Sequence, residues 1–391
     1  MHHILRFGLL CTILISMVFA SQANACLWDR DTLAMEAKDF PGITEIITGR
    51  FDRFPPLYYE MRLDRVATEV ESDPNNLDLY DDAAVACDRL GRSDEAIEWM
   101  TKKRAMLDSL TPTGGDHADH EYRYLANLGT FHIHRWLKNG ANREDMADVQ
   151  RSRELIAAAI ELNPDAHFGR ERYQLLAIEW ILNLDEIELG EGQSLIHQIE
   201  GYDSWFGSRN NELASLGYED AADGLMGLIA LGNAWQSIDI YYALGFTLGD
   251  QNDAVLSNLS MNRVRELVEA GSQSLLADFD YEQLDRAPVL IGIENEYKSE
   301  ISDWYTRARI EADDWIAQRN AFALERLKQG QHPDTHPDFW DEWTEQSAPP
   351  EFPSRPSIIF NFLAPVLVVS AILLLLAISG VVIAFKIRAR S

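Results

Sequence analysis

Apolar residues recur at spacings of three and four along most of the stretch from Pro56 to Gly330. This spacing places apolar side chains on one face of an α-helix, whereas the strict alternation typical of strands is scarce. The helical runs are interrupted by Asn-Pro and Asp-Pro pairs and by glycines, which end helices. The pattern therefore predicts an all-α fold made of many amphipathic helices.

Two pairs of helices stand out in this pattern. The first pair is predicted over about 77–90 and 94–108, with Gly91 breaking the chain between them and Ser93 capping the second helix. The second pair is predicted over about 121–138 and 146–162. Small residues on facing helices allow a close antiparallel approach, so each pair is expected to form a helical hairpin.

The first hairpin resembles a tetratricopeptide repeat (TPR), a helix–turn–helix unit of 34 residues. Tyr80, the small pair Ala83-Ala84, the turn residue Gly91 and Ala96 stand at the spacing of that family. The chain departs from the family at Lys103, where a small residue is usual, and at Asp108, where proline is usual. The second hairpin is a longer copy that ends in the family's Asn-Pro pair, and together the copies resemble exported bacterial TPR-like proteins.

The resemblance implies a short solenoid of stacked hairpins that binds a protein or peptide. On the resemblance and the helical faces, Tyr80, Lys103 and Asn127 are candidate binding residues. For Tyr80, packing in the core is an alternative to binding. The resemblance carries no enzymatic activity and no cofactor.

The composition divides the chain into regions. Residues 26–55 form a lead-in, 56–200 carry the TPR-like repeats, and 201–329 form a further helical region whose long last helix either caps the domain or forms a stalk. Residues 330–357 hold six prolines, several acids and Phe339, Trp340 and Trp343 without a helical period. They are predicted to be a plain juxtamembrane linker, with a partner motif or a bilayer anchor as alternatives.

Both ends of the chain carry targeting signals. Residues 1–25 read as a signal peptide with an apolar run and a small-residue cleavage site before Cys26. Residues 358–385 contain no charge and exceed the roughly 20 apolar residues that span a bilayer. Residues 386–391 are basic, which retains them on the cytoplasmic side. We therefore expect a single-pass membrane protein whose large domain is extracytoplasmic, in a periplasm or at a cell surface.

Charge restricts the partners of that domain. The part outside the membrane carries 30 basic and 63 acidic residues, a net charge of about −33. Nucleic acid is excluded as a partner, because binding it requires a basic face. The expected partner is an unknown protein or peptide, for which a positive patch would suit the acidity. Cys26 and Cys87 make no disulfide framework, and a single bridge or a lipid on Cys26 stays open.

The densest group of chemically active side chains is the run 116–121, in which Asp116, His117 and His120 are candidate metal ligands. A flexible loop leading to an acidic helix start explains the same residues without a metal. We find no nucleophile elbow, phosphate-binding loop or zinc motif. The sequence thus favours a membrane-anchored interaction scaffold that is not an enzyme, with a metal-dependent protein and a structural envelope assembly protein as alternatives.

Overall fold

The computed structural model describes residues 27–38, 40–111, 114–164, 169–186, 194–202, 211–277, 279 and 295–353. Every regular element within these ranges is a helix, which confirms the all-α prediction. The α-helices are α1 Arg30–Lys38, α2 Ile43–Thr48, α3 Pro56–Ser72, α4 Leu77–Arg89, α5 Ser93–Ser109, α6 Gly114–Lys138, α7 Ala147–Leu162, α8 Arg170–Leu182, α9 Glu212–Ser215, α10 Ala221–Ala230, α11 Ile238–Asp250, α12 Ala254–Glu269 and α14 Asn295–Lys328. Short 3₁₀ turns stand at η2 Leu184–Glu186 and η3 Leu195–Gln198.

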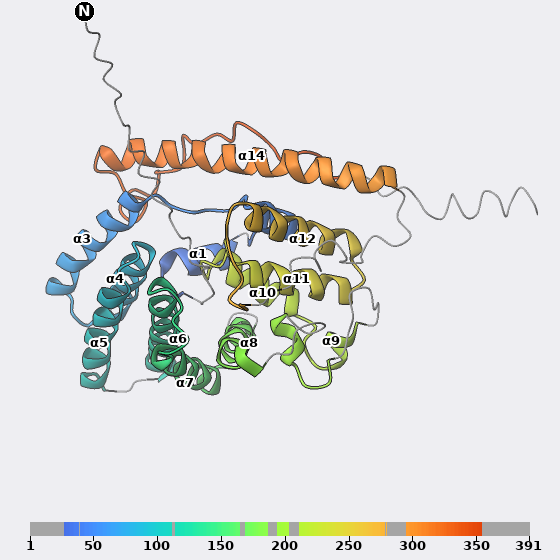
Figure 1. Cartoon of the computed structure of the whole chain (residues 1–391). Helices are drawn as coiled ribbons and strands as arrows, with labels where there is room; N and C mark the ends of the chain where they lie inside the picture. The colour runs from blue at the N-terminus through green and yellow to red at the C-terminus, as the bar shows by residue number, and fades with distance from the viewer. Residues whose placement is uncertain are drawn as a thin grey trace, which may run out of the picture.

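The first half of the domain is a row of helices in which each packs on the next, from α3 to α8 (Figure 1). The pairs α4/α5 and α6/α7 are the two predicted hairpins. Gly91 closes the first one at φ 71°, a left-handed conformation that glycine adopts without strain. Gly129 allows the second, since a Cβ there would lie 2.8 Å from Cδ1 of Ile156 on the facing helix.

The second half is built around α11, all of whose residues are buried. The helix packs closely against α12, where a Cβ on Gly245 would lie 2.1 Å from Cε of Met261. Hydroxyls tie the pair together, because Ser257 and Ser260 donate to the carbonyls of Gly245 and Tyr241 at 2.6 Å. The main hydrophobic core contains α10, α11 and α12 of this half and extends to residues of α2, α6, α7, α8 and α14.

Helix α14 extends along the molecule for about 50 Å at 1.5 Å per residue (Figure 1). It contacts α2, α3 and α12, which belong to both halves. Of the two sequence-based interpretations, cap and stalk, the structure shows the cap.

Residues 330–353, which we name the return segment, differ from the predicted plain linker. They fold back onto α14: the indole N–H of Trp304 donates to the Pro350 carbonyl at 2.9 Å, and Trp340 stacks on Phe322 with ring centroids 5.7 Å apart. Phe339 is fully buried against α3 and α14. The linker prediction fails here because proline-rich composition does not reveal that the aromatic side chains find apolar partners far away in the sequence.

No helix in the described ranges is long and apolar enough to cross a membrane. The predicted span at 358–385, the signal peptide at 1–25, the tail at 386–391 and Cys26 all lie outside the described residues. They remain predictions.

Candidate ligand pocket

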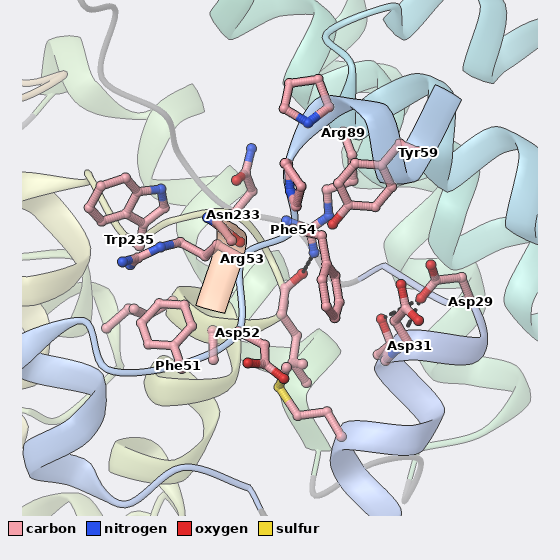
Figure 2. Close-up of a pocket in the computed structure, with 18 of the residues that line it drawn as sticks. Asp29, Asp31, Phe51, Asp52, Arg53, Phe54, Tyr59, Arg89, Asn233 and Trp235 are labelled. Carbon is pink, nitrogen blue, oxygen red and sulfur yellow. Dashed lines mark hydrogen bonds between the residues drawn. The ribbon is translucent and has the colours of Figure 1, made fainter. Parts of the chain in front are cut away.

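A cavity of about 470 Å³ lies beneath α14, where five stretches of the chain meet (Figure 2). Its walls come from residues 29–35 around α1, residues 51–59 before and within α3, Arg89 at the end of α4, residues 229–235 after α10, and two residues of α14. The volume is in the range of small-molecule sites. The cavity is thus assembled from both halves of the domain and from the helix that caps them.

Local chain geometry keeps the wall segments out of helices. Helix α2 is capped at its C-terminus by Gly49, whose φ of 79° is a left-handed conformation that glycine adopts without strain. Helix α3 begins at the Pro55-Pro56 pair, because proline fits the first turn of a helix but not its interior. Residues 50–54 therefore form a non-helical connection between two helices. After α10, Asn233 at φ 67° turns the chain back so that Trp235 reaches the cavity.

Aromatic rings form much of the wall. Phe51, Phe54, Tyr59 and Trp235 line the cavity together with Leu231. Phe54 is held in place by stacking on Tyr58, with ring centroids 4.2 Å apart. Such a lining suits an organic molecule with a flat or apolar body.

The three acids of the wall pair with two arginines. Asp29 and Asp31 accept from Arg62 at 3.2 and 2.7 Å, and Asp52 pairs with Arg319 on α14. Burial and the nearby Asp31 raise the pKa of Asp29 to about 6. These carboxylates are therefore occupied by partners within the fold.

Arg53 and Arg89 also line the cavity, and unlike Arg62 and Arg319 they have no carboxylate partner within the described residues. The Arg53 guanidinium lies between Trp235 and Phe51, 4.2 and 4.8 Å from the ring centroids, as Figure 2 shows. Its Nη1 is buried and makes no hydrogen bond in the described part of the chain. Burial lowers the pKa of Arg53 to about 10, and the charges of Arg309 and Arg263 act in the same direction. Arg89 donates to the Leu231 carbonyl at 2.7 Å.

The candidate binding residues taken from the TPR resemblance lie inside the fold. Lys103 is fully buried and its Nζ lies 2.6 Å from Asp81, while the side-chain amide of Asn127 bonds the same carboxylate and the Trp28 backbone. Tyr80 is buried and donates to the Pro74 carbonyl at 3.0 Å. The three side chains therefore make contacts in the core and do not line an open groove. Lys103 departs from the repeat pattern because it neutralises a buried acid.

The histidine run is also arranged differently from the prediction. His120 is buried, and one of its ring nitrogens lies with carboxylate oxygens of Asp78 and Asp81 within 4.8 Å of one another. His117 does not join this group, and the side chain of Asp116 is outside the described residues. Burial lowers the pKa of His120, as does the charge of Lys103. Since Lys103 already bonds Asp81, a cation at this place would compete with an ammonium group.

Sequence reasoning missed the cavity, because it placed residues 26–55 in a lead-in without function. The available signal was the stretch 51–59, in which two phenylalanines, two prolines and two tyrosines surround Arg53. Comparison with models of protein families, with curated proteins and with solved structures finds no match to this chain.

Proposed function

We propose that this chain is an exported, membrane-anchored helical binding protein that holds a small ligand in the cavity beneath α14. The observation that carries the proposal is the cavity itself, which has aromatic walls and two arginines that have no carboxylate partner among the described residues. A pocket formed by segments distant in sequence is the usual form of a small-molecule site. The proposal replaces a binding groove on the hairpins as the location of the site.

The experiment fills the cavity with a large side chain and measures which bound small molecules are then lost from the purified protein. Asn320 lines the cavity from α14 and is half-buried, so Asn320→Trp adds bulk into the cavity, whereas Gln318→Trp adds the same bulk on an exposed position of the same helix. The full chain is purified in detergent from its own host, denatured, and the released small molecules are measured by mass spectrometry. We expect a species enriched with the wild type and Gln318→Trp and depleted with Asn320→Trp. Identical extracts from all three proteins would contradict the proposal.

A protein partner on the row of hairpins is a second proposal, favoured by the uninterrupted stacking of α3 to α8. The charge of about −33 suits a partner with a basic patch, and such an association should slow as salt screens the attraction. It should also survive His117→Ala with His120→Ala. Association rates measured for both proteins between low and physiological salt test this.

A metal-dependent protein is supported by the approach of His120 to Asp78 and Asp81, and is weakened by Lys103 in the same group. Elemental analysis of the purified full chain decides this case. Stoichiometric metal that is lost in His120→Ala would favour it over the binding protein. Failure of all these tests would favour a structural envelope protein.

A further inference from the structure

The cavity contains a charge that forms no ion pair within the described residues, although the more distant charge of Asp313 acts on it. Five neighbouring arginines each have an acid: Arg50 pairs with Glu311, Arg62 with Asp31 and Asp334, Arg263 with Glu266, Arg309 with Glu266 and Asp313, and Arg319 with Asp52. Arg53 has none within the described residues, although most of its side chain is withdrawn from water. A buried cation without a counter-ion is unfavourable, so this position is stabilised when an anion arrives.

Arg89 adds a second positive group to the same cavity. Its guanidinium has five N–H donors, and the hydrogen bond to Leu231 uses one nitrogen. Tyr59, beside it in the wall, is close enough for the charge of Arg89 to act on the pKa of its phenol. Arg89 therefore retains donors that a ligand oxygen can accept from.

Within the described residues, the acids of the wall form no ion pair with Arg53 or Arg89. Asp29, Asp31 and Asp52 are held by Arg62 and Arg319, and the guanidinium groups of those arginines are consumed in the pairing. The molecule as a whole is strongly acidic, so a cavity with two spare arginines is a local exception. Because the net charge of the protein repels anions, any preference of this cavity for an anion must come from the local arginines.

The shape of the cavity adds a requirement on the rest of the ligand. A volume of about 470 Å³ is too large for a bare inorganic ion to fill, and Phe54 and Trp235 present apolar surface to it. Apolar or flat groups gain by contact with such walls.

We propose that the cavity binds a small organic oxyanion, a carboxylate or phosphate on an aromatic or apolar body, and that Arg53 and Arg89 are two separate positions in its wall that can hold the charged group (Figure 2). This inference rests on the proposed binding function. The inference specifies that the ligand is negatively charged and names Arg53 and Arg89 as the residues that recognise this charge. Carboxylate and phosphate share the same recognition by guanidinium groups, and the probes below separate them.

The test uses four probes of similar size on the full chain in detergent, with dissociation constants from calorimetry. The probes are phenylacetate, phenylphosphate, the neutral phenylacetamide and the cationic phenethylamine. We expect at least one anion to bind about tenfold or more tightly than the amide, the difference expected for a charge-assisted hydrogen bond. We expect the cation to bind most weakly.

Variants locate the effect. Arg53→Met keeps an unbranched apolar stem and removes the guanidinium group, and it should weaken the favoured anion about tenfold or more while leaving phenylacetamide unchanged. Arg89→Met should act in the same direction. Arg172→Met is the matched control, because Arg172 also lies over an aromatic ring, 3.5 Å from the centroid of Tyr218, and does not line the cavity. Removing an unpaired charge should also leave the melting temperature of Arg53→Met unchanged or raise it.

The outcomes separate this inference from the proposed function. Equal binding of amide and anions, lost in Asn320→Trp, would overturn the oxyanion while keeping a ligand pocket. Anion binding that is unaffected by Arg53→Met and Arg89→Met would also overturn the oxyanion inference. If no probe binds at millimolar concentration, the oxyanion inference fails, and the comparison of extracts from the wild type and Asn320→Trp decides separately whether the ligand pocket stands.

Discussion

Arg62 shows how single residues connect distant parts of this fold. Its side chain is fully buried and bonds Asp29 and Asp31 in the N-terminal segment and Asp334 in the return segment. A buried guanidinium is tolerated when its donors are satisfied in this way. The bonds from Arg62 lower the pKa of Asp334 to about 2 against the cost of burying it.

Asp334→Asn should therefore be strongly destabilising. Removing one partner leaves Arg62 buried and undercompensated, and the expected loss is about 3–5 kcal/mol of the free energy of unfolding. Urea denaturation of the full chain, followed by tryptophan fluorescence at pH 7, measures it. Asp338→Asn, at an exposed acid in the same segment, is the control and should change little.

The pairing of Arg62 with Asp334 also predicts how the stability of the protein depends on pH. Because the folded pKa of Asp334 is below its ordinary value, its contribution to stability is present above about pH 4 and is lost as the pH falls toward 2. The wild type should lose this contribution in that window, while Asp334→Asn should not. Parallel acid limbs for the two proteins would contradict the assigned pairing.

At the residue scale, sequence reasoning succeeds when the cause is local and fails when it is not. Gly91 was identified correctly because a helix break depends on neighbours within a turn. Lys103 was recognised as a departure from the repeat, but its partner Asp81 lies on another helix, so the sequence offered a binding role instead of a buried ion pair. The unpaired charge of Arg53 is equally invisible, since it depends on which acids the fold brings near.

At the element scale, the bounds of the first hairpin were predictable to within a residue, whereas α6 of the second begins at Gly114, seven residues before the predicted start at 121. Helices predicted at 77–90 and 94–108 stand at Leu77–Arg89 and Ser93–Ser109. Small residues, a breaking glycine and the helical period are all read within one hairpin. The return segment was not predictable, because its aromatic residues pack on α3 and α14 rather than on their own neighbours.

Ala96 tests the packing of the first hairpin. The residue is fully buried in a cluster with Val85, Cys87 and Met100. Ala96→Leu should overpack this contact and cost about 1–3 kcal/mol of stability. Glu98→Leu, on the exposed side of the same helix, provides the comparison. An unchanged urea midpoint for Ala96→Leu would show that α4 and α5 do not meet at this residue.

Phe339 tests the attachment of the return segment. Its ring is fully buried with Tyr58, Tyr59 and Leu327. Phe339→Ala should cost about 3–5 kcal/mol if the loss is global. If the segment opens alone, hydrogen exchange should accelerate over 331–345 while α11 stays protected. Phe352→Ala, at a more exposed ring, is the control. Unchanged exchange and stability in Phe339→Ala would refute the packing.

At the scale of the whole molecule, the cavity joins parts that the sequence separates. Asp29 and Asp31 line it and are bonded through Arg62 to Asp334, so the wall of the pocket is tied to the return segment. The described chain stops at residue 353, five residues before the predicted membrane span at 358. If that span crosses a membrane, the return segment connects the wall of the pocket directly to the membrane anchor. No property of the sequence alone indicated that these regions meet.

The topology is the last prediction and concerns both ends of the chain. The predicted signal peptide and the basic tail independently predict that the acidic domain lies outside and residues 386–391 inside. A broad protease added to intact cells or spheroplasts should therefore digest the region from Cys26 to Pro356. It should leave a small fragment detectable by an epitope fused after Ser391. Permeabilised cells serve as the control, in which the epitope should also disappear. N-terminal sequencing of the untreated protein should begin at Cys26. Protection of the whole domain in intact cells would place it in the cytoplasm, and recovery of Met1 would remove the cleaved signal, so the two halves of the prediction fail separately.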